Sequence, residues 1–535
     1  MKHRHFSKKC ICLFLLSALV LLGACSTDSL DVVAPEDSEE EVIGQSIGQE
    51  LVASYAADRV FSVNCMREES FDPYATPSNW NRMVSMLVYE NMLESESDFT
   101  VSPNLITGWS TDDGTNWYFS VDTTRLFHDG TPLSASDCVY SLNRARSSDM
   151  YSRRFASVAA AWAEDEGTFI VSLDEPNRQF YKLLTIPCIQ QSTGDSYHPG
   201  GTGPYYFNST GRMLMLSKSW PLYNQMPLKV IYLKQYTAAE DILQAFEDSY
   251  IDIVINDPTA MSTLGYSSAN IIKYVDTLNL HYLGYNMNST MFGQTVYRAM
   301  MTYAIDRSSI VSDCLEGAGV AASLPVHPLS PMYPTEYAET LNYSDGSFQI
   351  AVRNTGAADV TGDGILEIYS GPSAIEYTIN FVVCSESEAK VTAARKIAQQ
   401  LEDVGFSVNL RELSYDDYLQ ALENGDFDIY YAETRLTQDW NLSALFDANG
   451  ALNYGGVKDD YLANYLQSYL TADAAAEQDA FLALMQYIGQ SCPITAICFE
   501  RSEILYHRGV ISNASPHQDN LFYDFSNWTI CLDSD

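Results

Sequence analysis

The densest group of side chains able to bind a charged molecule lies between residues 430 and 441. Glu433 and Asp439 supply two carboxylates, and a buried carboxylate that meets an ammonium group forms a charge-assisted hydrogen bond of roughly 1.5–3 kcal/mol. Arg435 lies between them in sequence. Its planar guanidinium either holds a carboxylate through two parallel hydrogen bonds or pairs with Glu433 or Asp439. These charges predict a binding site, the alternative being a surface loop with ordinary charges.

Aromatic and amide side chains lie close to these charges in sequence. Tyr431 and Trp440 either form the wall of a pocket that accepts varied groups or belong to the core at the end of a strand. Asn453 begins an Asn-Tyr-Gly-Gly stretch, whose glycines allow the backbone to approach a bound molecule closely, although an ordinary loop has the same composition. The candidate binding residues are therefore Asp439, Glu433, Arg435, Trp440, Tyr431 and Asn453.

Catalytic signatures are absent from the sequence. Residues 359–364 resemble the start of a calcium-binding loop, but its twelfth position would be Ser370 in place of a bidentate acid, which favours a simple turn. No metalloprotease, nucleophile-elbow, phosphate-loop or dinucleotide motif occurs. The six histidines after residue 24 are too dispersed to define a catalytic cluster, though folding could gather two of them. We expect no enzyme activity, no cofactor and no bound metal.

The candidate binding segment follows the clearest regular pattern in the chain. Residues 377–383 and 407–413 read as strands, and residues 415–424 form a second helix before the strand at 427–431. Gly405 ends the helix between the first two strands. That helix carries one apolar stripe, formed by Val391, Ala394, Ile397, Ala398, Leu401 and Val404. The order β-α-β-α-β predicts parallel strands with helical crossovers, and therefore an α/β lobe.

A second patterned region lies between residues 101 and 142. A turn at Asp113-Gly114 precedes a strand at 117–121. Ser134 or Ser136 caps the helix that follows, because apolar residues then recur at helical spacing. Residues 298–306 and 461–488 also have helical periodicity. The whole chain therefore reads as mixed α/β without internal repeats.

The N-terminal residues read as a targeting segment. Four cationic residues precede an apolar run from residue 10 to residue 22, which is too short to span a bilayer comfortably. Leu-Gly-Ala-Cys at 22–25 resembles a bacterial lipobox, which predicts a signal peptide over residues 1–24 and a lipid attached to Cys25. Residues 25–50 are acidic and poor in large apolar groups, so we expect a flexible tether. An ordinary secretory signal with a chance cysteine is the alternative.

Charge and cysteine spacing exclude several classes of protein. The net charge is −39 and would become −43 after removal of the four signal-peptide cations, which excludes nucleic acid as a partner. The eight cysteines after residue 25 are scattered and contain no Cys-x-x-Cys pair, so neither a zinc knuckle nor a small disulfide scaffold fits. Cys492 and Cys498 are the expected bridged pair.

Four motifs together resemble the extracytoplasmic solute-binding protein family 5, which includes the oligopeptide-, dipeptide- and nickel-binding proteins of ABC importers. Their order and spacing across about residues 55–530 make the resemblance specific. The motifs are SFDP at 70–73, RLFHDGTPL at 125–133 with SDCVYSL at 136–142, GTGPYYF at 201–207, and YLGYN at 282–286 with RA at 298–299 and YAIDR at 303–307.

The resemblance implies a two-lobed periplasmic-binding-protein-like fold with two hinge crossings and a subdomain inserted in the first lobe. The expected boundaries are 51–75, 196–286 and 498–535 for the first lobe, 76–195 for the inserted subdomain, and 287–497 for the second lobe. Ligand capture in such a fold occurs by hinge closure.

The resemblance also implies a function. In peptide binders of the family, an Asp after the last strand of the second lobe pairs with the peptide ammonium, a role that falls here on Glu433 or Asp439. The usual Trp before that Asp is missing, which leaves the assignment open. We expect a monomeric, lipid-anchored protein on the extracytoplasmic face of the cell membrane that delivers short peptides to ABC permease subunits. The alternatives are a nickel chelate, haem or an oligosaccharide as ligand, or a receptor or adhesion lipoprotein without transport.

Overall fold

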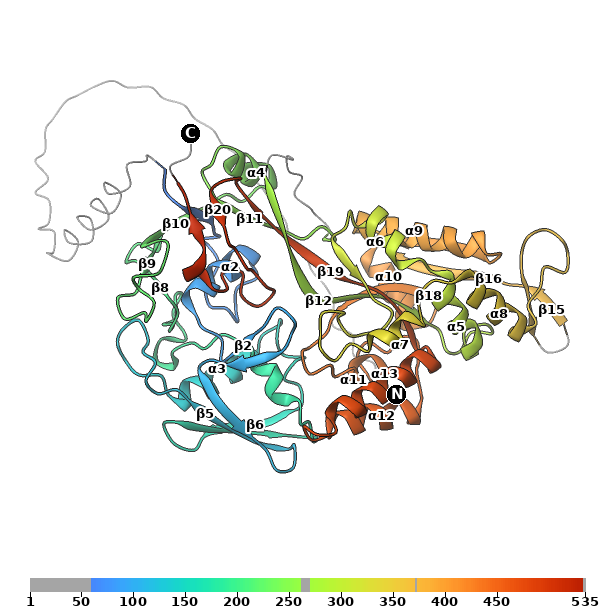
Figure 1. Cartoon of the computed structure of the whole chain (residues 1–535), viewed down its shortest axis with the longest axis horizontal. Coiled ribbons are helices and arrows are strands. Elements are labelled where there is room, and N and C mark those ends of the chain that lie inside the picture. Colours follow the sequence, from blue (N-terminus) through green and yellow to red (C-terminus); the bar gives the residue numbers. More distant parts are fainter. Residues whose placement is uncertain (1–58, 261–269, 371–372, 533–535) are drawn as a thin grey trace, which may run out of the picture. The chain divides into compact units, whose positions relative to one another are not determined.

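Two long antiparallel strands form the centre of the largest sheet (Figure 1). The computed structural model describes residues 59–260, 270–370 and 373–532, so Cys25, the expected signal peptide and the acidic segment lie outside the described residues. Strand β12 (Ile271–Tyr285) pairs with β19 (Ile494–Tyr506) from one end to the other. Their register shifts between Asp276 and Leu280, where three residues of β12 lie opposite Glu500 alone. Such a bulge bends a strand and redirects its side chains.

One side of this pair carries the predicted β-α-β-α-β unit. Strand β18 (Ile429–Arg435) pairs with β12 in antiparallel orientation, and β16 (Thr378–Cys384) pairs in parallel with both β18 and β17 (Ser407–Leu413). Helices α9 (Glu388–Asp403) and α10 (Tyr415–Asn424) are the two crossovers. The apolar stripe of α9 is buried, and the chain leaves this helix through Gly405 at φ +97°. The prediction of parallel strands with helical crossovers is confirmed.

The other side of the pair continues the same sheet with shorter strands. Strand β19 pairs with β11, β11 with β1, and three more strands complete the order. These strands are β11 (Ile253–Asn256), β1 (Ser62–Asn64), β10 (Val230–Lys234), β9 (Met213–Leu216) and β8 (Tyr205–Phe207), and β13 (Gly319–Ala321) pairs with β19 beside this path. The paired strands β12 and β19 therefore lie between the two groups of strands, with β18 next to β12 and β11 next to β19, and they join the two groups into one sheet.

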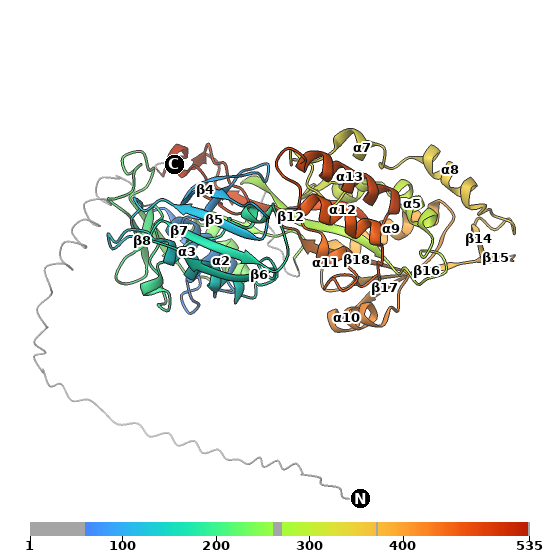
Figure 2. The ribbon, with the colours of Figure 1, turned by 90° about the horizontal axis from the view of Figure 1, so that it is seen from below.

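A separate four-stranded antiparallel sheet lies between β1 and β8 in the sequence. It consists of β4 (Ile106–Ser110), β5 (Asn116–Val121), β7 (Thr168–Leu173) and β6 (Val158–Ala163). Helix α3 (Ala135–Arg146) packs on this sheet (Figure 2). Ser134 caps it in a capping box with Asp137, which confirms the first of the two predicted caps.

The remaining α-helices and β-strands surround these sheets. They are helices α2 (Asn79–Val88), α4 (Ala239–Glu247), α5 (Thr295–Ala304), α6 (Arg307–Cys314), α7 (Thr335–Glu339), α8 (Asp345–Thr355), α11 (Ser443–Phe446), α12 (Asp460–Leu470) and α13 (Glu477–Ser491), and strands β2 (Leu93–Ser95), β3 (Val101–Pro103), β14 (Glu367–Ser370), β15 (Ser373–Glu376), β20 (Ile511–Ser512) and β21 (Thr529–Ile530). None of the helices in the described part of the chain combines the length and the apolar character that a bilayer crossing requires.

The expected Cys492–Cys498 disulfide is wrong, because both thiols are free. Cys492 ends α13, whereas Cys498 lies four residues inside the extended strand β19. Four strand residues span about 13 Å, and disulfide formation requires Cα atoms within about 7 Å of each other. Burial raises the pKa of Cys492 to about 11, so this thiol is also poorly reactive.

Candidate functional site

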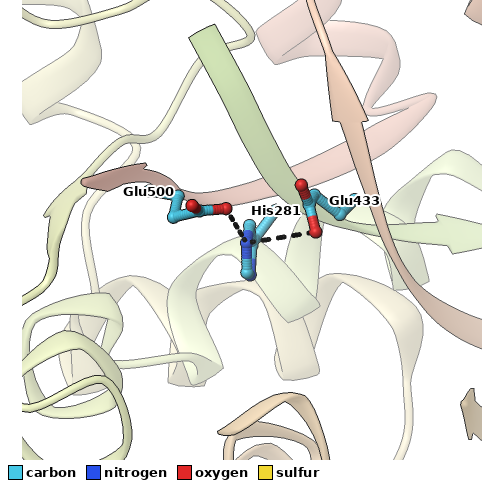
Figure 3. A group of neighbouring side chains, drawn as sticks. All are labelled: His281, Glu433 and Glu500. Carbon is cyan, nitrogen blue, oxygen red and sulfur yellow. Dashed lines mark ion pairs between the residues drawn. The ribbon is translucent and has the colours of Figure 1, made fainter. Parts of the chain in front are cut away.

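Strand β18 directs two of the predicted binding residues, Glu433 and Arg435, into different surroundings. Glu433 pairs with Lys390 at 2.5 Å between Oε2 and Nζ. The same oxygen lies 3.9 Å from Nε2 of His281 (Figure 3). Its side chain is 24% exposed. Glu433 therefore belongs to a charged cluster on the central strands.

Arg435 lies at the end of β18 and lines a cavity bordered by β12, β19 and helix α2. Its guanidinium is 52% exposed and donates from Nη2 to Oδ1 of Asp519 at 3.2 Å. It pairs with neither of the acids that sequence proximity suggested, because Glu433 is held by Lys390. A half-exposed guanidinium with one partner keeps donors available for a ligand carboxylate.

Asp439 is buried and its carboxylate is already hydrogen-bonded. It accepts bonds from the side chains of Asn177 at 3.0 Å and Thr437 at 2.5 Å, and from the backbone N–H of Asn441 at 3.3 Å. Asp439 is not among the residues that line the cavity. In this conformation it joins the loop after β18 to the loop that carries Asn177.

The other three predicted residues also have structural partners and are absent from the cavity wall. Trp440 is 2% exposed and packs in the core next to α12 and α13. The hydroxyl of Tyr431 lies 2.8 Å from Nδ1 of His281. The side-chain amide of Asn453 bonds the carbonyl oxygens of Asp447 and Val457 and thereby closes its own loop.

The cavity has a volume of about 740 Å³, within the range of small-molecule and cofactor sites. Helix α2, the segment around β2 and β3, and residues 518–526 form one part of its wall, and β12, β19 and Arg435 form another. Loop and strand segments far apart in sequence thus meet around the bulge of β12. Trp220, Tyr523 and Phe525 supply aromatic surface.

Charged groups of both signs line the cavity, with a large excess of acids. The lining acids are Glu90, Glu94, Glu96, Asp257, Glu500, Glu503, Asp519 and Asp524, and the lining bases are Arg82 and Arg435. Such a wall attracts positively charged groups, and the guanidinium groups can receive a carboxylate.

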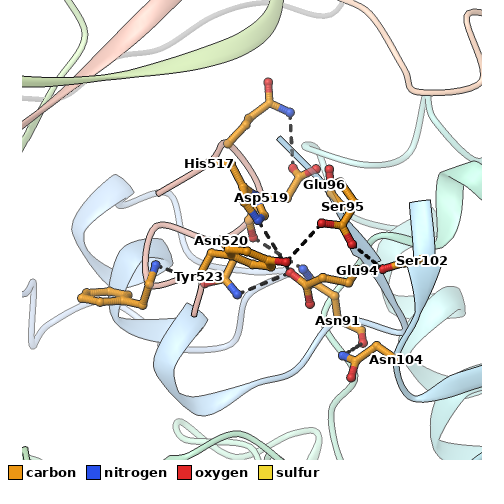
Figure 4. Close-up of polar contacts among 12 residues, drawn as sticks. Asn91, Glu94, Ser95, Glu96, Ser102, Asn104, His517, Asp519, Asn520 and Tyr523 are labelled. Atoms are coloured by element: carbon orange, nitrogen blue, oxygen red, sulfur yellow. Dashed lines mark hydrogen bonds and ion pairs between the residues drawn. The ribbon is translucent and has the colours of Figure 1, made fainter. Parts of the chain in front are cut away.

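Within the acidic wall, Glu94 and Glu96 contact the segment that carries Asn520 and Tyr523 (Figure 4). Glu96 accepts hydrogen bonds from Ser102 at 2.6 Å and Tyr523 at 3.1 Å. Glu94 receives one long bond of 3.4 Å from Asn520. Burial, with repulsion from Asp519 and other nearby acids, raises the pKa of Glu94 to about 7. A cation placed here would relieve that repulsion.

The basic part of the wall is formed by Arg82 and Arg435. Arg82 bonds the backbone oxygen of Thr76 at 3.3 Å and the side chain of Asn79, and among the described residues no carboxylate lies within ion-pair distance of it. Burial lowers the pKa of Arg82, and the nearby Arg435 lowers it further. An anionic group between the two guanidinium groups would offset this repulsion.

Sequence reasoning identified Arg435 and missed the rest of the charged wall. The acids at 94 and 96 occur in a run, Leu-Glu-Ser-Glu-Ser-Asp at 93–98, whose alternation is the available signal. Asp519 and Tyr523 carry no comparable signal, because only the tertiary fold brings residues 518–526 beside β2 and Arg435. The pattern of isolated polar residues there is typical of any loop.

Comparison with known proteins agrees with this architecture. Residues 100–451 match the family described as bacterial extracellular solute-binding proteins, family 5. The oligopeptide-binding protein AppA of Bacillus subtilis is 24% identical over 355 residues, which are 60% of this chain and 62% of AppA. The aligned region thus spans about three fifths of that relative.

Solved structures show the same fold. AppA from Bacillus subtilis in complex with a nonapeptide matches with a TM-score of 0.59 at 18% identity, covering 88% of this chain and 100% of AppA. The nickel ABC transporter structure from Bacillus halodurans matches with a TM-score of 0.70 at 18% identity, covering 87% and 98% of the two chains.

A sheet crossed by two shared strands, with a charged cavity beside them, defines a two-lobed α/β ligand-binding protein. The chain belongs to family 5 of the bacterial extracellular solute-binding proteins, which confirms the resemblance and the predicted fold class.

Proposed function

We propose that this protein captures short peptides outside the cytoplasm and delivers them to the permease of an ABC importer. The observation that carries the proposal is the cavity wall, in which Arg82 and Arg435 lie in the same cavity as an excess of carboxylates. A peptide is zwitterionic, and a wall of this kind meets both of its termini. AppA, a relative of this chain, is named as an oligopeptide-binding protein.

Hinge closure supplies the mechanism of capture. The segment after β18 is hydrogen-bonded to the part of the chain between β1 and β8. The side chain of Gln438 accepts a hydrogen bond from Thr185 at 2.8 Å and donates one to Ser95 at 2.6 Å. Lys182 pairs with Glu477 at 2.6 Å. We propose that these contacts form on closure and open to release the peptide, while the sheet strands β12 and β19 flex as the hinge. We propose that the first lobe comprises residues 51–75, 196–286 and 498–535, with residues 76–195 as its inserted subdomain, and that the second lobe comprises residues 287–497.

The N-terminal sequence supports a proposal for the location. We propose that the chain is cleaved before Cys25, acylated there, and held as a monomer at the extracytoplasmic face of the cell membrane by its lipid. Two acyl chains hold a protein stably on a bilayer, whereas a single chain does not. Labelling with a radioactive fatty acid, with Cys25→Ser as the unlabelled control, tests the anchor.

Native mass spectrometry tests the ligand class. Residues 26–535 are purified, their mass is measured before and after mild denaturation, and any released molecule is sequenced. Peptides of a few residues support the proposal, and Arg435→Gln should recover less peptide than wild type. Arg395→Gln is the matched control, because Arg395 is an exposed arginine bound to Glu412 outside the cavity. A single non-peptide mass, or an empty protein that ignores a peptide library, would overturn the peptide assignment.

A further inference from the structure

Strand register brings three potential metal ligands onto one face of the central sheet. His281 on β12 lies opposite Glu433 on β18 and opposite Cys498 on β19. Side chains two residues apart on a strand share a face, so Glu500 lies on the same face as Cys498. The three ligand groups therefore come from three adjacent strands, and none is within 60 residues of another in sequence.

The ligand atoms are spaced as the donors around one ion are spaced. Nε2 of His281 lies 3.6 Å from Oε2 of Glu500 and 3.9 Å from Oε2 of Glu433 (Figure 3). One ligand atom from each residue lies within 4.8 Å of the others. Donors placed tetrahedrally at about 2.1 Å from a metal are about 3.4 Å apart, so a small contraction of this group would suffice.

Burial and missing hydrogen bonds point to a ligand. His281 is fully buried, and its Nε2 has no hydrogen-bond partner. Glu500 is 1% exposed, and its Oε1 also lacks a partner. The other carboxylate oxygen of Glu500, Oε2, accepts a hydrogen bond from Asn279 at 3.2 Å. A buried nitrogen or oxygen atom that lacks a hydrogen bond costs free energy. Nδ1 of His281 is held by the hydroxyl of Tyr431 at 2.8 Å, the kind of outer contact that orients a metal-binding imidazole.

The surrounding charge also favours a divalent cation. Asp257 interacts with Glu500 and adds a third carboxylate to the group. Lys390 is the cation now paired with Glu433, and it balances one of three acids. Glu500 and Asp257 line the large cavity, which gives an ion a route to the group.

We propose that His281, Glu433 and Glu500 bind a divalent first-row transition-metal ion, such as Zn²⁺ or Co²⁺, with solvent completing the coordination. An imidazole with carboxylates favours these ions over Mg²⁺ or Ca²⁺, which prefer oxygen ligands alone. The ion would displace Lys390 from Glu433 and join β12, β18 and β19 at their shared face. The site does not depend on the identity of the transported solute.

Titration of metal-free protein with Co²⁺ and Zn²⁺ tests the site, with binding measured by calorimetry and, for Co²⁺, by visible absorption. We expect one ion per chain. His281→Gln should weaken binding at least about 100-fold, since loss of an outer-shell partner alone costs about 10–100-fold. Tyr431→Phe should fall within that smaller range. Lys390→Met should tighten binding because it removes the competing cation, a gain that misfolding cannot produce.

His327→Gln is the matched control. His327 is also fully buried with an unpartnered Nε2, but it faces a single carboxylate, that of Asp276 at 3.8 Å. This variant should bind the metal as wild type does. Equal metal affinity in wild type and a folded His281→Gln, or no binding by wild type at millimolar Co²⁺, would overturn the proposal and would show that the group is an imidazole paired with two acids.

Discussion

Replacing Glu94 by Gln should stabilise the protein at alkaline pH and leave it unchanged at acid pH. Burial, with repulsion from neighbouring acids, raises the pKa of Glu94 from 4.5 to about 7, and its side chain is 18% exposed. Below pH 4.5 this group is protonated in both the folded and the unfolded chain. Between pH 4.5 and pH 7 the unfolded chain releases the proton and the folded chain keeps it, so the stability of the wild type falls as the pH rises.

The size of the effect follows from the shift. One pKa unit corresponds to 1.36 kcal/mol, so the full shift amounts to about 3 kcal/mol above pH 7. Gln keeps an oxygen for the bond from Asn520 and removes the charge. Urea unfolding of both proteins at pH 4.5, 6, 7 and 8 should therefore show a difference that grows from zero to as much as about 3 kcal/mol.

Glu175→Gln is the control, because Glu175 is exposed and its removal changes the net charge by the same amount. Its stability difference from wild type should stay near zero across the pH range. A pH-independent difference for Glu94→Gln, or a Glu94→Gln protein that is less stable than wild type at pH 8, would refute the reasoning that uncompensated charge accumulates in the cavity.

Three further outcomes are expected. Arg435→Gln should lower peptide affinity about tenfold or more in calorimetry while changing the unfolding free energy by less than about 1 kcal/mol, because the side chain is half exposed; unchanged affinity would exclude it from the site. Gly284→Ala should destabilise the fold by about 1–3 kcal/mol, since a Cβ there would lie 2.0 Å from the ring of Tyr430. Gly108→Ala is the control and should not destabilise the fold, because a Cβ there would have nothing within 4 Å. Equal urea midpoints for the two variants would contradict this. Alkylation in denaturant without reductant should label Cys492 and Cys498 fully, because both thiols are free. If both cysteines resisted alkylation, the disulfide between them would be the better assignment.

Local pattern predicted the elements that carry their own signal. Helix α9 has an apolar stripe, a capping Ser387 and a terminal Gly405, so three independent local preferences agree on its limits. The parallel strands around it follow from the crossover rule. Ser134 was one of two candidate caps, and the structure selects it because Asp137, three residues later, completes a capping box.

The site could not be predicted in the same way, because its geometry depends on pairing between distant strands. Glu433 was recognisable as an acid near a strand end, but its neighbours His281 and Lys390 are set by register, and a shift of one residue would turn each side chain to the opposite face. Trp440 illustrates the converse difficulty. Its aromatic side chain is of the type that lines a pocket wall, yet its buried position in the core depends on packing that no local pattern encodes.

The position of β19 has a consequence for the synthesis of the protein. This strand pairs with β11, β12 and β13, all of which precede it by more than 170 residues. In the described residues, β11 and β12 do not pair with each other, and β19 lies between them in the sheet. The two halves of the sheet therefore cannot join until residues 494–506 have been made. Contacts between segments so distant in sequence also form slowly. A ribosome has therefore made nearly the whole described chain before the cavity can form. A secretory apparatus that accepts unfolded chains can act during that interval.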